Sequence, residues 1–296
     1  MNTKTVILIT GPTASGKTSL ALSVAQHYKT EIISADSRQC FIEMNIGVAK
    51  PSAQELYAVP HHFINSHSIH QEVNAATFAL YANEAAENIF VNNDKLVLAG
   101  GTGLYIKSFL EGLDNIPAIS ADVRKNILEQ YGQHGLGWLQ DEVRAYDPDF
   151  FSKGEIKNPQ RLMRALEVKL GTGRSIKDFH GKIRIGGAAE KYNVVKYAID
   201  ISREQLYHNI NSRVDKMMED GLLDEVKALL PYRNLNALQT VGYTELFDHI
   251  NGNISLKEAV EKIKQNTRNY AKRQMTWFRK DKEMVWIKSF SDVIQK

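Results

Sequence analysis

The segment 11–18, which reads Gly-Pro-Thr-Ala-Ser-Gly-Lys-Thr, constrains the fold of this chain more than any other feature of the sequence. It matches the phosphate-binding loop, in which backbone N–H groups converge on an anion at the start of a helix. The β-branched run 5–10 predicts a strand before the loop, and the apolar spacing in 17–28 predicts a helix after it. The residues expected to bind phosphate are Gly11, Pro12, Thr13, Ala14, Ser15, Gly16, Lys17 and Thr18. Lys17 would place a positive charge on the phosphates, and the Thr18 hydroxyl would bind Mg²⁺.

Strand-like and helix-like segments alternate through the first third of the chain. Residues 31–35 and 95–99 have the composition of buried strands, and residues 75–90 between them have helical spacing. This alternation predicts a parallel sheet, whose ligands bind at the carboxyl ends of its strands. We therefore expect an α/β fold: a P-loop NTPase-like parallel sheet core with a helical insertion domain and a helical C-terminal part.

The insertion is expected over residues 117–187, where strand patterns stop. Its expected segments are helices at 121–131, 136–146 and 158–170, followed by a loop at 181–187. The core would comprise residues 1–116 and 188–296. Residues 194–201 predict one more strand in the core, and the sequence predicts only helices after it.

The C-terminal part combines helix signals with an excess of positive charge. Gly221 is expected to end a helix that starts near Arg203, and Ser255 with Glu258 forms a capping box at the start of the last long helix. Between residues 257 and 288, ten Lys or Arg stand against four Asp or Glu, although the net charge of the whole chain is only +3. Such a segment fits either a surface that binds a polyanion or a solvated helix face. Its cations at helical spacing are Lys264, Arg268, Lys272 and Arg279.

Composition narrows the class of protein. The single cysteine, Cys40, excludes an internal disulfide framework and a cysteine-rich zinc site, and it fits a reducing compartment. No apolar run approaches the ~20 residues that a membrane helix needs, and the N-terminus lacks the profile of a signal peptide. We therefore expect a cytoplasmic monomer that makes no membrane contact.

The loop does not by itself define an activity. A nucleoside triphosphatase usually has a second strand that ends in Asp and holds the water shell of the metal. Here the strand 95–99 runs instead into Gly-Gly-Thr, and the nearest acid at a strand end is Asp36. Asp36 could anchor a metal, deprotonate an acceptor or simply cap a turn.

Seven further blocks run in order along nearly the whole chain and resemble the tRNA dimethylallyltransferases (tRNA isopentenyltransferases). They are Ser-Ala-Asp-Ser-Arg-Gln (34–39), Ile-Gly-Val-Ala-Lys-Pro (46–51), Pro-His-His (60–62), Gly-Gly-Thr-Gly-Leu-Tyr (100–105), Asn-Pro-Gln-Arg-Leu-Met-Arg-Ala-Leu-Glu (158–167), Val-Gly-Tyr (241–243) and Ala-Lys-Arg-Gln-Met-Thr-Trp-Phe-Arg (271–279). The resemblance implies transfer of a dimethylallyl group from dimethylallyl diphosphate to N6 of the adenosine 3′ to the anticodon. The tRNAs would be those that read codons beginning with U.

The resemblance also implies roles for individual residues. The loop would hold the diphosphate, Thr102 and Arg213 would clamp its oxygens, and Asp36 would be the general base on the amine. An anticodon stem-loop suits such an enzyme because its unpaired bases can be flipped into a pocket and stacked. The residues expected to contact tRNA are Asp36, Ser37, Arg38, Gln39, Thr102, Arg124, Gln160, Arg161, Leu162, Met163, Arg164, Lys264, Arg268, Lys272 and Arg273. Trp277 and Phe278 are expected to pack in the core, with stacking on bases as the alternative.

The chain departs from the family pattern at four positions. They are Cys40, Phe41, Val48 and Asn209, where the family usually has Val, Tyr, Thr and Arg. The departures bear on secondary contacts and leave the loop, Asp36, Thr102 and Arg213 intact. We expect His61 and His62 to be structural and to bind no metal.

Two other functions fit parts of the sequence. A small-molecule or nucleoside kinase would use the loop for ATP and Asp36 as the base toward a hydroxyl, but it leaves the basic C-terminal segment unexplained. A non-catalytic RNA-binding module would bind tRNA without turnover.

Overall fold

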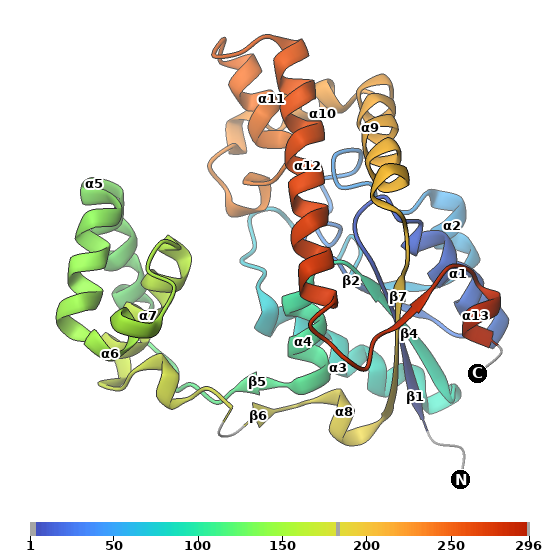
Figure 1. Ribbon diagram of the computed structural model, residues 1–296, viewed down its shortest axis with the longest axis horizontal. Helices are drawn as coiled ribbons and strands as arrows, with labels where there is room; N and C mark the ends of the chain where they lie inside the picture. Colours follow the sequence, from blue (N-terminus) through green and yellow to red (C-terminus); the bar gives the residue numbers. More distant parts are fainter. Residues whose placement is uncertain (1–3, 182–183, 295–296) are drawn as a thin grey trace. The chain divides into compact units, whose positions relative to one another are not determined.

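β1 (Thr5–Thr10) lies inside a six-stranded sheet and pairs in parallel with the neighbours on both sides, β4 (Lys95–Gly100) and β7 (Asn193–Ile199) (Figure 1). The sheet order in this computed structural model is β3-β2-β4-β1-β7-β8, and every pairing in it is parallel. The remaining strands of this sheet are β2 (Ile32–Ala35), β3 (His61–His62) and β8 (Val285–Ile287). The expected α/β class with a parallel sheet core is confirmed.

The structure describes residues 4–181 and 184–294. Residues 1–3 and 295–296 of the expected core, and residues 182–183 of the expected loop, lie outside the described residues. The chain divides into two units, one formed by Met1–Glu111 with Gly186–Lys296 and the other by Gly112–Ile185. Among the described residues, no helix is both long enough and apolar enough to span a membrane.

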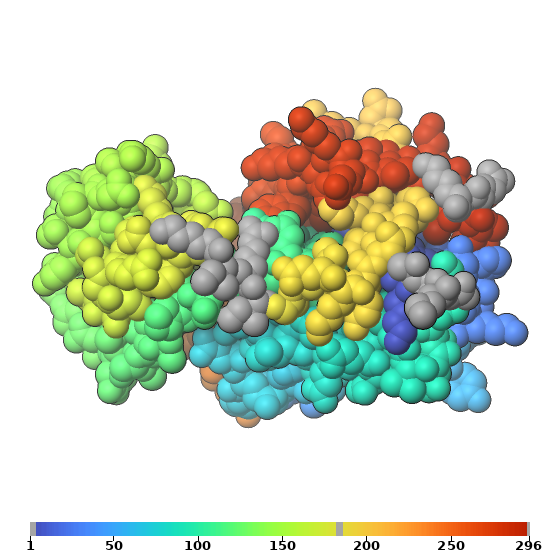
Figure 2. Space-filling model, turned by 90° about the horizontal axis from the view of Figure 1, so that it is seen from below, coloured from blue at the N-terminus to red at the C-terminus, as the bar shows by residue number. Residues whose placement is uncertain are grey.

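Helices cover both faces of the sheet in the larger unit. They are α1 (Lys17–Tyr28), α2 (Ala53–Ala58), α3 (Ala75–Asn92), α4 (Gly103–Glu111), α8 (Ala188–Lys191), α9 (Arg203–Glu219), α10 (Leu222–Ala228), α11 (Tyr243–Ile250), α12 (Leu256–Phe278) and α13 (Ser291–Ile294). Figure 2 shows one face, on which the yellow segment of α8 and β7 borders the red C-terminal part of the chain.

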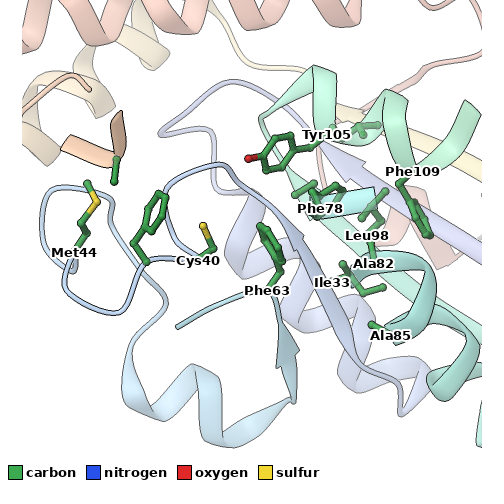
Figure 3. Packing of buried hydrophobic residues seen from close by; sticks show 14 of the residues in the cluster. Ile33, Cys40, Met44, Phe63, Phe78, Ala82, Ala85, Leu98, Tyr105 and Phe109 are labelled. Atoms are coloured by element: carbon green, nitrogen blue, oxygen red, sulfur yellow. The ribbon is translucent and has the colours of Figure 1, made fainter. Parts of the chain in front are cut away.

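The side chains of β1 alternate between two cores, as the period of two in a strand requires. Val6 and Leu8 join the larger core, which includes residues of α3, α4, α11 and α12, whereas Ile7 and Ile9 pack with α1 and α13. In the larger core Phe63 makes edge contacts with Phe78 and other rings (Figure 3). A strand buried on both faces explains why the run 5–10 is apolar throughout.

The smaller unit is helical and has its own core. It contains α5 (Ala121–Tyr146), α6 (Pro148–Lys153), α7 (Pro159–Thr172) and a two-stranded antiparallel sheet of β5 (Leu113–Asp114) and β6 (Arg184–Ile185). The two helices expected at 121–131 and 136–146 form α5, which is interrupted where Gly135 has a φ of 73°. β6 corrects the expectation of a loop over 181–187, because the partner strand of β6 lies some seventy residues earlier and leaves no local signal.

Most boundaries predicted from the sequence agree with the structure. α1 and β1 have the predicted bounds, Gly221 follows the end of α9 with a φ of 99°, and the capping box of Ser255 and Glu258 is present. The expectation that only helices follow residue 201 is wrong. β8 forms after α12 because its three residues pair with the end of β7 and complete the sheet.

Candidate active site

The phosphate-binding loop connects the end of β1 to α1. α1 begins after Gly16, which has a φ of 88° and no side chain to cap the helix, so the N–H groups of the first turn remain for an anion. The Nζ of Lys17 donates a hydrogen bond to the carbonyl of Pro12 at 2.8 Å. The Ser15 hydroxyl is buried and has no hydrogen-bond partner within the described part of the chain. Both features fit a loop built to take a phosphate group.

Two cations face each other across the loop. Burial, together with the nearby Arg213, lowers the pKa of Lys17 from 10.5 to about 8, and Asp36 raises it in part. Burial also lowers the pKa of the Arg213 guanidinium, and the nearby Asp36 raises it in part. A bound polyanion would reverse both effects, because an opposite charge favours the protonated form.

Gln274 of α12 joins the loop to the turn that follows β4. The Oε1 atom of its buried side chain accepts a hydrogen bond from the N–H of Thr13 at 2.8 Å, and its Nε2 atom donates to the carbonyl of Gly101 at 2.9 Å. A Cβ on Gly101 would lie 2.3 Å from that Nε2 atom, so a larger residue there would displace the Gln274 amide. Gln274 belongs to the block 271–279, and the sequence analysis did not assign it to the site.

Asp36 directly follows β2 and lies at the same end of the sheet. Its Oδ1 atom accepts hydrogen bonds from the N–H groups of Arg38 at 2.9 Å and Gln39 at 3.2 Å. Within residues 4–181 and 184–294 no hydrogen bond engages its Oδ2 atom. One oxygen therefore caps the turn, as the structural interpretation of Asp36 expected, and the other is available for proton transfer.

Thr102 ties the Asp36 turn to the end of β4. Its hydroxyl accepts a hydrogen bond from the N–H of Ser37 at 3.1 Å, and its own N–H donates to the carbonyl of Ala35 at 3.1 Å. The Tyr270 side chain of α12 lies beside Thr102, and burial raises the pKa of the Tyr270 phenol to about 12. Tyr270 thus stays protonated at neutral pH and can act as a donor in the site.

Asp36 and Arg213 lie where two cavities of the larger unit meet. The first cavity is polar and contains the loop; its polar lining includes Thr13, Lys17, Thr18, Ser34, Asp36 and Arg213. The second is mainly apolar; its lining includes Ile210, Val214, Met217, Leu222, Val241 and Ile263. Thr13, Asp36, Val48 and Arg213 line both cavities. A reagent with a charged end and an apolar end could therefore lie across this boundary.

Gln39 and the residues that depart from the family pattern have identifiable contacts. The Gln39 amide donates to the carbonyls of Val48 and Ala49, which fixes the loop that lines both cavities. Asn209 donates to the carbonyl of Ala14 at 3.1 Å, so it supports the phosphate-binding loop from α9. Cys40 is fully buried, and burial raises the pKa of its thiol to about 12. Cys40 and Phe41 both pack in the larger core.

Glu225 of α10 is a second residue that the sequence analysis missed. Its carboxylate accepts hydrogen bonds from the N–H groups of Asn45, Ile46 and Gly47 and from the Tyr243 hydroxyl at 2.6 Å. Burial and Glu225 raise the pKa of Tyr243. This carboxylate therefore fixes the wall of the apolar cavity from a position nearly two hundred residues away in the sequence.

The basic face of α12 is partly neutralised. Lys264 is only 14% exposed and pairs with Asp215 at 2.7 Å and with Glu261, and these bonds raise its pKa. Arg268 donates to the Asn211 side chain and lies over the Tyr207 ring. Lys272 and Arg273 are exposed. The cations predicted to bind tRNA are thus unequal, and those near the end of the helix are the most accessible.

In the smaller unit, the expected tRNA contacts divide into surface and core. Gln160, Arg161 and Arg164 line one cavity of this unit. Arg161 pairs with Glu155, while Arg124 and Arg164 both pair with Glu167. The side chains of Leu162 and Met163 pack in the core of the unit, with exposures of 0% and 8%, which corrects the expectation that they reach tRNA. The helical period of α7 turns these two residues inward.

His61 and His62 make local contacts. The Nδ1 atom of His61 lies 2.8 Å from the carbonyl of Val59, and the Nε2 atom of His62 lies 2.6 Å from the Glu31 carboxylate. No cluster of three or more His, Cys, Asp or Glu suited to a metal occurs among the described residues.

Trp277 and Phe278 have different environments. Phe278 packs in the larger core with an exposure of 2%, as expected, whereas Trp277 is 41% exposed, so the expectation of core packing is wrong for Trp277. The two residues follow one another on α12 and therefore point about 100° apart around the helix.

Comparison with known proteins gives consistent results. A family model described as IPP transferase matches residues 39–281. The chain is 43% identical over 282 residues to the tRNA dimethylallyltransferase of Christiangramia forsetii, and this alignment covers 95% of this chain and 92% of that protein. It is 40% identical over 283 residues to tRNA dimethylallyltransferase 1 of Phocaeicola vulgatus, which covers 96% and 93%.

Solved structures agree with these matches. The full-length tRNA isopentenylpyrophosphate transferase of Bacillus halodurans has a TM-score of 0.71 and 34% identity, covering 99% of this chain and 93% of that one. A eukaryotic dimethylallyltransferase acting on tRNA has a TM-score of 0.80 and 25% identity, covering 97% and 75%.

The lowered pKa of Lys17 predicts that anion binding depends on pH. Above about pH 8 the free protein loses the Lys17 proton, so the affinity for inorganic diphosphate should fall by up to about tenfold per pH unit until the pKa of the complex is reached. Titration calorimetry between pH 7 and 9 measures this slope. The Lys17→Arg variant keeps its charge over this range, so its pH dependence reports the titration of the diphosphate itself. If the affinity of both proteins changed equally with pH, the prediction would be contradicted.

Replacement of Gln274 should weaken anion binding. Gln274→Ala leaves the Thr13 N–H and the Gly101 carbonyl without their partner, at a cost of about 1–3 kcal/mol for each group that stays buried. Gln274→Glu keeps the acceptor for Thr13, loses the donor to Gly101 and adds a negative charge beside the loop. We expect both variants to bind inorganic diphosphate less tightly than the unaltered protein does. At equal stability, Gln274→Glu should bind it more weakly than Gln274→Ala. Calorimetry and urea unfolding check this, and unchanged affinity in both variants would refute it.

Proposed function

This chain belongs to the IPP transferase family, and from that premise we propose that it transfers a dimethylallyl group from dimethylallyl diphosphate to tRNA through the site at the junction of its two cavities. The single observation that carries this proposal is the position of Asp36 and Arg213, which line both the polar cavity of the phosphate-binding loop and the apolar cavity beside it. The family match and the named relatives favour this activity over a kinase.

The leaving diphosphate would occupy the polar cavity. When the C–O bond of the allylic diphosphate breaks, negative charge builds on the departing oxygens. The loop N–H groups, Lys17 and Arg213 would stabilise this charge from the lining of that cavity, with Thr102 as a further expected donor, and this would lower the barrier directly. The short dimethylallyl group would face the apolar cavity, whose aliphatic lining excludes water from the reacting carbon.

The acceptor would be N6 of the adenosine immediately 3′ to the anticodon in tRNAs that read codons beginning with U. An exocyclic amine is a weak nucleophile, so removal of its proton as the C–N bond forms assists the attack. The unbonded oxygen of Asp36 takes that proton, while its other oxygen holds the turn in place. The base must leave its stack to reach this point, at a cost of a few kcal/mol.

Mg²⁺ fits this site as a companion of the diphosphate. Mg²⁺ keeps several waters and binds through one or two protein oxygens and the phosphates of a substrate. Thr18 offers a hydroxyl at the start of α1, and the Asp36 carboxylate lines the same cavity. Bound there, the ion would neutralise charge on the departing diphosphate.

The tRNA would be held by its anticodon stem-loop. The exposed Lys272 and Arg273 of α12 and the basic residues of the α7 cavity are suited to its phosphates. We propose that the monomer is the active form.

Incubation with labelled substrates tests the function. We expect label from dimethylallyl diphosphate, and none from ATP labelled in its γ-phosphate, to enter bulk tRNA. Nucleoside analysis of the product should find a dimethylallyl group on adenosine N6, and the same nucleoside should be missing from tRNA of cells that lack this protein. Transfer from ATP alone would establish the kinase, and tRNA binding with no transfer would establish the binding module.

Asp36→Asn isolates the role of the base. Asparagine retains an oxygen that can accept from the N–H groups of Arg38 and Gln39, so the turn should persist, but it cannot take a proton. The rate at saturation should fall by about 10²–10⁴ with little change in tRNA affinity. Single-turnover rates and filter binding separate the two quantities, and equal losses in both would assign Asp36 to binding instead.

A further inference from the structure

Trp277 lies on the surface of α12 with one face of its ring covered. A Cβ on Gly103 would lie 2.3, 2.5 and 2.6 Å from the indole atoms Nε1, Cδ1 and Cε2. Such similar distances to three neighbouring ring atoms place that point over the ring plane rather than at its edge. The indole therefore lies flat on the backbone at the start of α4, while 41% of the residue remains exposed.

The surroundings of this ring are apolar and positively charged. Leu104, the residue after Gly103, is 57% exposed. Arg273 lies one turn before Trp277 on α12. Lys107 lies one turn after Gly103 on α4, with 45% of its side chain exposed and its Nζ atom 4.0 Å from the Glu111 carboxylate. An aromatic ring beside cations is the arrangement that binds unpaired nucleotides, because the ring stacks on a base and the cations bind the phosphates.

Trp277 lies against the residue that directly follows Thr102. Thr102, which lies beside Tyr270 and hydrogen-bonds the Asp36 turn, directly precedes Gly103. Tyr270, Gln274 and Trp277 occupy successive turns of α12. Tyr270 lies beside Thr102, Gln274 donates to the carbonyl of Gly101, and Trp277 lies against Gly103. A nucleotide whose base enters the site thus brings the adjacent nucleotide of the same strand toward Trp277.

We propose that the exposed indole face of Trp277, extended by Leu104, stacks on the unpaired base next to the target adenosine in the anticodon loop, while Arg273 and Lys107 bind the flanking phosphates. This inference rests on the proposed function, since it assigns a position to the RNA strand that the site modifies. It commits to RNA because the apolar area is one ring and one leucine flanked by cations, which is small for a protein partner.

The test is a double-mutant cycle on RNA binding, measured without dimethylallyl diphosphate. The probes are an anticodon stem-loop RNA and two copies of it, each with an abasic nucleotide on one side of the target adenosine. Trp277→Ala should weaken binding of the intact RNA by about 5- to 100-fold, as expected for the loss of one stacked base. One of the two abasic RNAs should bind the unaltered protein more weakly by a similar factor and show no further loss with Trp277→Ala.

Matched variants separate stacking from general damage. Trp277→Phe should recover most of the affinity, and Tyr57→Ala, which removes another exposed aromatic ring in α2, should change nothing. Binding of inorganic diphosphate should be the same with Trp277→Ala as with the unaltered protein, which a structural role would not allow. Additive losses for Trp277→Ala and both abasic RNAs, or unchanged RNA binding by Trp277→Ala, would overturn the stack. Intact RNA binding without prenyl transfer would instead overturn the proposed function and leave the stack standing.

Discussion

The two hydrogen bonds of the Gln274 amide are the constraint on which the rest of the site depends. They connect α12 to the phosphate-binding loop and to the turn after β4, across 261 and 173 residues of sequence. With Gln274 fixed, the helix can place Tyr270 against Thr102 on one side and Trp277 against Gly103 on the other. An amide near the C-terminal end of α12 thus links the positions of Thr102 and of a surface ring.

The positive charges of the site are only partly compensated within the protein itself. Burial lowers the pKa of both Lys17 and Arg213, Arg213 lowers that of Lys17 further, and Asp36 only partly opposes these effects. Buried cations that lack full pairing are costly, because transfer of a charge out of water must be compensated. A bound diphosphate would supply that compensation, and in the proposed reaction the Asp36 oxygen that is not engaged in the turn would take the proton.

Local patterns predicted the fold where the determinants are local. The loop motif and the apolar runs around it gave β1 and α1 with their observed bounds, since both depend on neighbouring residues. β8 was missed because three residues after a long helix carry no periodicity, and only pairing with β7 makes them a strand. Gln274 and Glu225 were missed for a related reason. Their partners lie far away in the sequence, so no local pattern indicates their contacts. Trp277 and Phe278 are adjacent, and helical spacing alone did not show that only Phe278 turns into the core.

Charge counts along α12 overstate its affinity for a polyanion, and the structure shows where the excess is effective. Lys264 is neutralised by Asp215 and Glu261, so its charge adds little field at the surface. Arg268 is held by Asn211. The accessible cations lie near the end of the helix, at Lys272 and Arg273. This is the same stretch of α12 that carries Gln274 and Trp277. In the proposed function, the attraction for phosphates would therefore be concentrated at this end of α12, and binding energy from the strand would orient the reacting base.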